Sequence, residues 1–246
     1  MPSHIAAIIP AAGLGLRLGG GTAQASSGSV DAQPSLGDSS PPKALKLLAG
    51  QSLVRRAAAT LTSMVDQLVV AVPADWVGQV EADLSEGVGV PVVVVPGGAT
   101  RQQSVQLALA AVAADTEWVL VHDAARPLVP AAVVRRVVAG LRHGANAVIP
   151  TIAVADSLRQ TLDSGASVPL DRTRVHAVQT PQGFCRAVLT QAHRRATGGD
   201  ASDDATLVEQ CGVEVAIVAG DELAFKITRP IDLALAETIL KARAAT

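Results

Sequence analysis

Residues 4–17 read His-Ile-Ala-Ala-Ile-Ile-Pro-Ala-Ala-Gly-Leu-Gly-Leu-Arg, an apolar run of strand length followed by a loop of small residues that ends in Arg17. Glycine and alanine leave room for main-chain N–H groups to face the oxygens of a polyanion, and an arginine adds a fixed positive charge. This stretch therefore predicts a buried strand that leads directly into an anion-binding loop.

Two common phosphate-binding loops do not fit this stretch. A dinucleotide fingerprint requires a third glycine at the position that Leu18 occupies. A Walker A loop requires a lysine and a hydroxyl residue after its last glycine, and neither is present. A loop with Arg17 suits a nucleoside triphosphate better than a dinucleotide, but the loop alone also fits an ordinary turn that packs a strand against a helix.

The composition narrows the class of protein. Of the 246 residues, 49% are hydrophobic and only 2% are aromatic, so the core must consist of Ala, Val, Leu and Ile. Such a core favours parallel strands covered by alanine-rich helices over a β-sandwich. A net charge of −2 and the scarcity of aromatic residues argue against nucleic acid as a partner.

Cysteine spacing and hydropathy argue against several further classes of protein. Cys185 and Cys211 have no C-x-x-C spacing, which argues against a zinc site or a disulfide framework. The N-terminus lacks the basic segment of a signal peptide, and no apolar stretch reaches the length of a membrane span. We therefore expect a cytoplasmic protein with no membrane partner.

Strand-length apolar runs alternate with stretches of helical period about every 25 residues, which is typical of βαβ units in a parallel sheet. The expected strands are Ile5–Ile9, Leu68–Val72, Val92–Val95, Trp118–Val121 and Ala147–Pro150. The expected helices lie near Leu53–Met64, Asp75–Leu84, Gln102–Ala113 and Ala131–Leu141. Ligands of such sheets bind beyond the carboxyl ends of the strands, so motifs at those ends are the first candidates for a site.

Two segments interrupt this alternation. Residues 19–42 are rich in Gly, Ser, Pro and Gln, which predicts a flexible surface insert. Residues 153–178 carry a Gly-Ala-Ser turn and are expected to form a hairpin or arm that projects from the sheet. After the arm we expect helices over 183–196 and 203–210, a strand over 213–218 and a closing helix over 231–244.

The apolar run that begins at Trp118 ends in His122, Asp123, two alanines and Arg126. A carboxylate at a strand end, in a sheet that already has a phosphate loop, favours a site for an oxygen-loving cation such as Mg²⁺, with substrate phosphates as the other ligands. The alternative is structural, with Asp123 capping the following turn and Arg126 pairing with it.

Three further features are candidates for the same site. Lys43 follows Pro42 and is close in sequence to the phosphate loop apart from the insert, so it is a candidate phosphate ligand. Lys226 lies near the end of a late strand, where a solvent-facing role is the alternative. The glycine pair at 97–98 follows a strand, with Ser104 one turn into the next helix, and backbone groups there could contact the edge of a base.

Taken in order along the chain, these motifs match one known family. They are Pro10-Ala-Ala-Gly13 with Arg17, Pro42-Lys43, His122-Asp-Ala-Ala-Arg-Pro127, Asp171-Arg172, Gln179-Thr-Pro-Gln182 and Lys226-Ile-Thr-Arg-Pro-Ile-Asp-Leu233. The combination resembles the 2-C-methyl-D-erythritol 4-phosphate cytidylyltransferases of the non-mevalonate isoprenoid pathway. The resemblance implies a single Rossmann-like α/β nucleotidyltransferase domain over residues 1–246, with a mostly parallel sheet flanked by helices and a protruding arm through which two subunits pair as a homodimer. It also implies the transfer of CMP from CTP to methylerythritol phosphate, with release of pyrophosphate and Mg²⁺ as the cofactor.

The resemblance also implies roles for individual residues. The catalytic residues would be Arg17, Lys43 and Lys226, which would stabilise charge on the α-phosphate and the departing pyrophosphate or contact the attacking substrate. Asp123 would hold Mg²⁺. The cytosine nucleoside would lie against Ala11, Ala12, Gly13, Gly97, Gly98 and Ser104. Methylerythritol phosphate would be bound by Ser157, Arg172 and Arg126, the first two reaching it from the arm of the partner subunit.

The chain departs from the family pattern at three places. Ser157 replaces the usual threonine, Ala99 stands where some members have an aspartate, and the insert at 19–42 is unusually long. The insert is expected to close over CTP when it binds. Two alternatives stay open: a ribitol-5-phosphate cytidylyltransferase, which shares the chemistry, and a catalytically silent nucleotide-binding regulator, against which the intact set of cations and the acid argue.

Overall fold

The computed structural model describes residues 4–13, 41–196 and 201–244. Arg17 and almost all of the predicted insert lie outside the described residues. Within them, no helix has both the length and the hydropathy that a membrane span requires.

The core is one mixed sheet in the order β10-β7-β11-β6-β1-β4-β5, with β12 also paired to β7. Its strands are β1 (His4–Pro10), β4 (Gln67–Val72), β5 (Val92–Pro96), β6 (Thr116–Val121), β7 (Ala147–Ala153), β10 (His176–Val178), β11 (Gln182–Cys185) and β12 (Ala216–Ala219). β1 runs parallel to β4 and β6, β5 parallel to β4, and β12 parallel to β7. The five strands expected before residue 153 are confirmed, and the sheet is mostly parallel.

One helix prediction was wrong at its start. Residues 182–185 form β11, which lies antiparallel between β6 and β7, and the helix α5 (Arg186–Arg195) begins only after it. Phe184 is fully buried in this strand. A Cβ on Gly183 would lie 2.6 Å from Val137 Cγ1 and 2.9 Å from Leu141 Cδ1, so glycine lets a helix pack closely on the strand. Contacts from distant segments, rather than local periodicity, define this strand.

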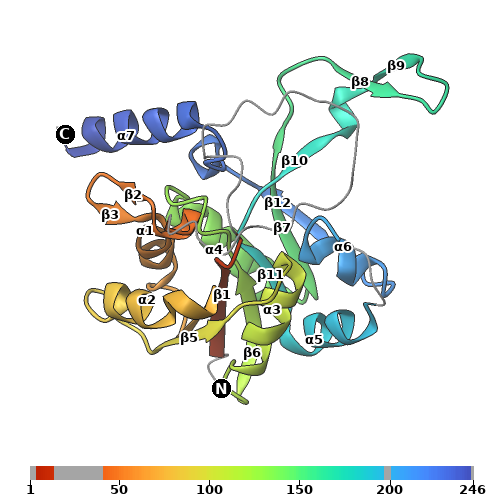
Figure 1. Ribbon diagram of the computed structural model, residues 1–246. Coiled ribbons are helices and arrows are strands. Elements are labelled where there is room, and N and C mark those ends of the chain that lie inside the picture. The colour runs from red at the N-terminus through yellow and green to blue at the C-terminus, as the bar shows by residue number, and fades with distance from the viewer. Residues whose placement is uncertain (1–3, 14–40, 197–200, 245–246) are drawn as a thin grey trace, which may run out of the picture.

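Helices cover both faces of the sheet (Figure 1). One face packs against α1 (Leu53–Leu61), α2 (Val77–Leu84) and α4 (Ala131–Arg142), and the other against α3 (Arg101–Ala110), α5 and α6 (Asp204–Glu209). Along β1, Ile5, Ala7 and Ile9 join the first core, whereas Ala6 and Ile8 join the second. This alternation follows from the period of two residues in a strand and explains why the whole run is apolar.

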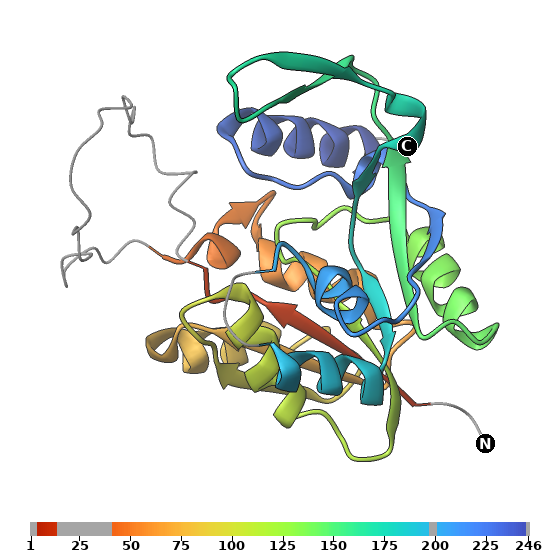
Figure 2. The ribbon, with the colours of Figure 1, turned by 90° about the vertical axis from the view of Figure 1, so that its right-hand side faces the viewer.

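A hairpin lies within residues 153–178 and projects from the body of the molecule (Figure 2). Its strands β8 (Leu158–Thr161) and β9 (Ser167–Leu170) pair antiparallel, and Gly165 adopts a φ of +79° in the turn between them. The short helix η3 (Arg172–Arg174) follows at the base of the arm. Pairing of two subunits through this arm stays a prediction.

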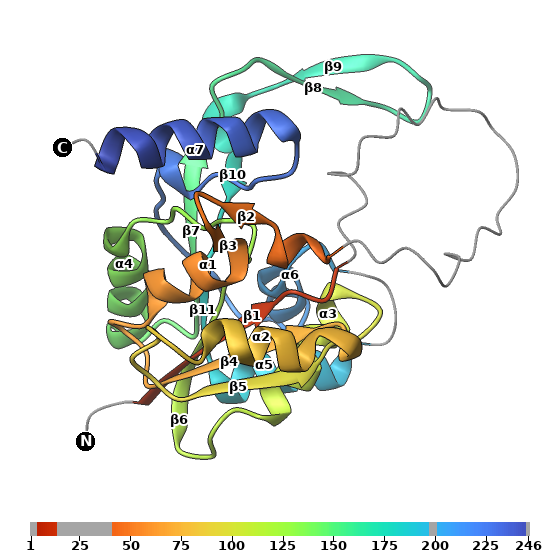
Figure 3. The ribbon, with the colours of Figure 1, turned by 60° about the vertical axis from the view of Figure 1, so that its left-hand side comes forward.

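The closing helix α7 (Pro230–Ala244) lies above a small hairpin of β2 (Leu47–Leu48) and β3 (Gln51–Ser52) (Figure 3). A separate apolar cluster, which includes Leu48 of β2 and Ala236 of α7, joins the two elements. The predicted late strand begins at Ala216 rather than Val213. Three further short helices are η1 (Lys43–Leu45), η2 (Ala74–Trp76) and η4 (Glu222–Ala224).

Candidate active site

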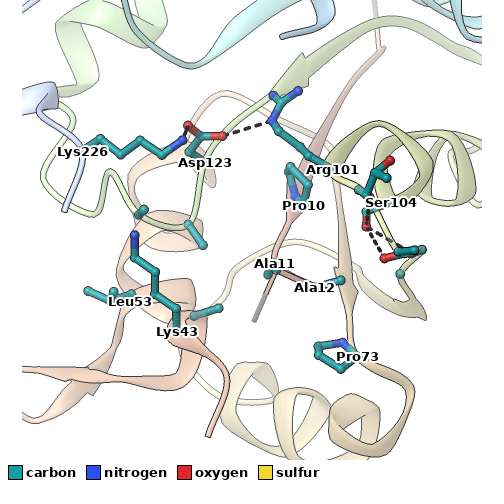
Figure 4. Close-up of a pocket in the computed structure, with 18 of the residues that line it drawn as sticks. Pro10, Ala11, Ala12, Lys43, Leu53, Pro73, Arg101, Ser104, Asp123 and Lys226 are labelled. Carbon is teal, nitrogen blue, oxygen red and sulfur yellow. Dashed lines mark hydrogen bonds and ion pairs between the residues drawn. The ribbon is translucent and has the colours of Figure 1, made fainter. Parts of the chain in front are cut away.

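A cavity of about 840 Å³ lies beyond the carboxyl ends of β1, β4, β5 and β6 (Figure 4). Strand ends converge there because parallel strands finish at the same edge of a sheet. Nine of the residues that the sequence predicted for a nucleotide site line it: Ala11, Ala12, Gly13, Lys43, Gly97, Gly98, Ser104, Asp123 and Lys226. The structure therefore brings together residues from most of the length of the chain.

One wall of the cavity consists of small residues in close contact. A Cβ on Gly97 would lie 2.4 Å from Ala12 Cβ, so only glycine permits this approach of the two loops. The backbone of each loop is tied to the sheet, with Ala11 N donating to Ala71 O and Gly97 N to Val72 O, both at 2.7 Å. The small side chains of this wall leave room for a flat ligand.

Ser104 holds the glycine loop in place. Its Oγ accepts a hydrogen bond from Gly98 N at 3.1 Å and donates to Thr100 O at 2.9 Å. Thr100 in turn caps α3, since its hydroxyl oxygen accepts from Gln103 N. The hydroxyl of Ser104 thus shapes the loop that faces the cavity, and a direct contact with the nucleoside stays a prediction.

Asp123 is the only acid among the described residues that line the cavity, and cations surround it. Its carboxylate lies 2.9 Å from Lys226 Nζ, 3.5 Å from Arg101 Nε and 3.7 Å from Arg126 Nε. Burial alone would raise the pKa of Asp123, but Lys226 and Arg101 outweigh burial and hold that pKa well below its ordinary value. Asp123 is therefore ionised at neutral pH.

His122 lies directly behind Asp123 and is fully buried. Thr180 Oγ1 accepts from Asp123 N at 3.1 Å, so its own hydrogen is available to His122 Nδ1 at 2.9 Å. His122 Nε2 is then the protonated nitrogen and faces Arg126 O at 3.3 Å. Burial is the main cause that lowers the pKa of His122 to about 4, and the nearby positive charge of Arg126 acts in the same direction against that of Asp123.

The buried imidazole predicts a loss of stability in mild acid. Since the folded ring takes up a proton only near pH 4 and the unfolded one near 6.5, the unfolded chain binds more protons between these values. The contribution of His122 to the free energy of unfolding is therefore complete above pH 6.5. It is lost as the pH drops, which lowers the free energy of unfolding by about 2 kcal/mol at pH 5. Urea unfolding at pH 7 and pH 5 measures this. His122→Gln should be less stable than wild type at pH 7 but should lose less of its free energy of unfolding between pH 7 and pH 5. As a control, a change at an exposed histidine, His143→Gln, should keep the wild-type difference between the two pH values. An unchanged difference in His122→Gln would contradict the assignment.

Arg126 does not line the cavity. Its guanidinium donates to Ala224 O at 2.6 Å and to Val178 O at 3.2 Å, and its Nε points toward Asp123 without a hydrogen-bond partner among the described residues. These contacts join the segment after β6 to η4 and to the end of β10. Within one chain this placement lets Arg126 support Asp123, and the contact of Arg126 with the acceptor stays a prediction.

The two predicted arm residues also lie away from the cavity. Ser157 and Arg172 are exposed at the base of the arm, where Arg172 Nη1 donates to Ala155 O. The structure of one chain therefore does not bring them to the nucleotide residues, and their contact with an acceptor stays a prediction. Arg17, the third predicted catalytic cation, falls in the part of the chain that the structure does not describe.

Sequence reasoning gave no role to Arg101, which lines the cavity and contacts two acids, Asp123 and Asp204. A signal existed: an arginine in the first turn of a helix is unfavourable for the helix dipole unless an acid or anion lies beside it. Asp204 and its partner His193 were missed because nothing in their spacing links them to the cavity.

The donor set fits a divalent cation that is shared with substrate. No group of three or more His, Cys, Asp or Glu residues able to hold a metal occurs among the described residues. Magnesium in nucleotide enzymes is commonly bound by one or two carboxylates together with substrate phosphates and water. Asp123, ionised and facing the cavity, matches that pattern.

Comparisons with known proteins identify the family of the chain. The model of the 2-C-methyl-D-erythritol 4-phosphate cytidylyltransferase family matches residues 5–242. Two proteins of that name are similar over nearly the whole chain. The Saccharopolyspora erythraea protein is 46% identical over 242 residues (96% of this chain and 99% of that protein), and the Streptomyces coelicolor protein is 43% identical over 256 residues (98% and 87%).

A solved structure gives the same result. The crystal structure of 2-C-methyl-D-erythritol 4-phosphate cytidylyltransferase from Thermus thermophilus superposes with a TM-score of 0.73 at 34% identity, covering 97% of this chain and 99% of that one. The fold, the cavity residues and these relatives lead to one assignment. The chain belongs to the 2-C-methyl-D-erythritol 4-phosphate cytidylyltransferase family.

Proposed function

We propose that this chain transfers CMP from CTP to 2-C-methyl-D-erythritol 4-phosphate, giving 4-diphosphocytidyl-2-C-methyl-D-erythritol and pyrophosphate in isoprenoid precursor biosynthesis. The observation that carries the proposal is the cavity itself, in which a wall of small residues faces two lysines and an ionised acid. Family membership over residues 5–242 supports the same reaction.

The chemistry needs positioning and charge stabilisation more than a nucleophile from the protein. A phosphate oxygen of the acceptor forms a bond to the α-phosphorus of CTP, and the bond from that phosphorus to the bridging oxygen breaks to release pyrophosphate. Lys43 and Lys226 line the cavity from separate segments and would stabilise the negative charge that builds on the phosphates. Arg17 is proposed for the same task on the basis of its motif.

The base and ribose of CTP would lie against Ala11, Ala12, Gly13, Gly97 and Gly98. Asp123 would hold Mg²⁺ together with the triphosphate, and the ion would supply charge neutralisation at the phosphates. Lys226 now pairs with Asp123 at 2.9 Å, and its side chain is 42% exposed. We propose that Lys226 moves from the carboxylate to the substrate phosphates when CTP binds.

The acceptor site would be completed by a second subunit. Ser157 and Arg172 stand on the arm rather than at the cavity of their own chain, and an arm from a partner could bring them to it. Leu162, Val168 and Leu170 of the arm each have 38–40% of their surface exposed, which suits pairing with another copy. A guanidinium binds phosphate through two parallel hydrogen bonds, so Arg172 suits the phosphate of the acceptor. We propose a homodimer on these grounds.

The deciding experiment measures pyrophosphate release from CTP and Mg²⁺ with methylerythritol phosphate and ribitol 5-phosphate offered separately. We expect turnover with methylerythritol phosphate. Turnover with ribitol 5-phosphate alone would assign the chain to the rival cytidylyltransferases. Binding of CTP without turnover on either acceptor would instead favour the nucleotide-binding regulator.

A further inference from the structure

A chain of ion pairs runs from the cavity wall into the protein interior. Arg101 Nη1 lies 2.7 Å from Asp204 Oδ2, and Arg101 Nε lies 3.5 Å from Asp123 Oδ1. The other oxygen of Asp204 lies 2.9 Å from His193 Nε2. Asp204 is fully buried and His193 nearly so, whereas neither lines the cavity. The chain thus links α5 and α6 to the acid at the end of β6.

Arg101 suits the centre of this chain. Its planar guanidinium presents donors in several directions, so one side chain can contact two carboxylates at once. Burial alone would lower the pKa of Arg101, but the two acids raise it, so the cation is retained. The guanidinium of Arg101 lies closer to Asp204 (2.7 Å) than to Asp123 (3.5 Å), so Asp204 is the residue that anchors it.

Asp204 is held from more than one side. It is the first residue of α6, and the preceding Asp203 caps that helix by accepting from Thr206 N at 2.9 Å. His193 Nε2 lies 2.9 Å from Asp204 Oδ1, and His193 Nδ1 is buried without a partner among the described residues. Both carboxylate oxygens of Asp204 are therefore engaged, one by Arg101 and the other by His193.

A buried network of this kind is not by itself evidence of stabilisation. Removing two charges from water costs several kcal/mol, and apolar residues of similar volume often stabilise a fold equally well. The position of this network, one contact away from the acid that faces the cavity, suggests another reason for its presence.

We propose that Asp204 and His193 are positioning residues for the cytidylyltransferase reaction: they hold Arg101, which fixes the carboxylate of Asp123. Arg101 faces Oδ1 of Asp123 and Lys226 faces Oδ2 (Figure 4). When Lys226 leaves for the substrate phosphates, Arg101 keeps the carboxylate in the orientation that CTP requires. This inference rests on the proposed function of the cavity.

The experiment compares Asp204→Asn, Arg101→Lys and the double variant with a matched control. Arg136→Lys is the control, because Arg136 also donates to two acceptors, the carbonyls of Ala219 and Gly220, but lies outside the cavity lining. The readouts are kcat, the KM of each substrate, thermal unfolding, and the affinity for CTP with Mg²⁺ measured calorimetrically without acceptor.

Asp204→Asn and Arg101→Lys should each lower kcat about 10- to 100-fold, the usual loss for a residue that orients a functional carboxylate, and should weaken CTP binding. The KM of the acceptor should stay near the wild-type value. Because both changes break one chain of contacts, the double variant should be no more than about twofold worse than Arg101→Lys. Arg136→Lys should retain wild-type turnover.

A purely structural role gives a different pattern. Asp204→Asn would then melt at a lower temperature but keep wild-type kcat and CTP affinity, and this outcome would overturn the proposal, as would additive losses in the double variant. Should Asp204→Asn fail to fold, Arg101→Lys still decides, since lysine leaves a cation beside Asp204. Absence of turnover in the wild type would contradict the proposed reaction, and the CTP affinities would still test the positioning.

Discussion

Asp123→Asn is expected to lower turnover about a thousandfold, the upper end of what one lost charge contact costs in a preorganised site. Asparagine keeps the shape of the side chain but removes the charge that pairs with Lys226 at 2.9 Å. It also removes the one acid that the described lining residues offer to a divalent cation. Pyrophosphate release at saturating CTP and acceptor measures the loss.

Two controls separate this loss from a damaged fold. Asp66→Asn changes another carboxylate next to β1, which accepts from Ile5 N at 2.8 Å at the opposite end of the strand, and it should leave turnover near wild type. Asp123→Glu keeps the charge but moves it by one methylene, so it should lose less than Asp123→Asn. A folded Asp123→Asn variant with more than a tenth of the wild-type rate would remove Asp123 from the catalytic centre.

The sequence predicted those parts of the fold in which local pattern and tertiary environment agree. β1 and β4 are buried on both faces, so their apolar runs are continuous and easily found. β11 was missed because its residues, Gln182–Cys185, carry no apolar run. Its place depends on β6 and β7, which lie on either side of it.

The same reasoning applies to the site. Asp123 was found because it ends a recognisable strand, and Lys43 because it follows a proline pair after the phosphate loop. The contact between Arg101 and Asp204 joins positions 103 residues apart and depends on how α6 packs near the start of α3. Sequence spacing does not predict such a contact, because each residue is typical of the start of an ordinary helix.

Lys43→Ala is expected to lower turnover by about a hundredfold or more, because it removes a cation that would face the triphosphate. Lys43 is the first residue of η1 and lines the cavity on a segment separate from those of Asp123 and Lys226 (Figure 4). It is only partly buried, so its removal should change thermal unfolding little. The loss should appear mainly in kcat, since the charge to be stabilised is greatest when the bond to pyrophosphate breaks.

Lys46→Ala is the matched control, because Lys46 has the same charge, lies three residues further along the same segment and does not line the cavity. Its turnover should stay within about twofold of wild type, as is usual for changes outside a site. Lys43→Arg should recover part of the lost rate, since it restores a cation of different shape. Equal losses in Lys43→Ala and Lys46→Ala would point to the segment as a whole, and a wild-type rate in Lys43→Ala would show that the triphosphate is stabilised by other cations.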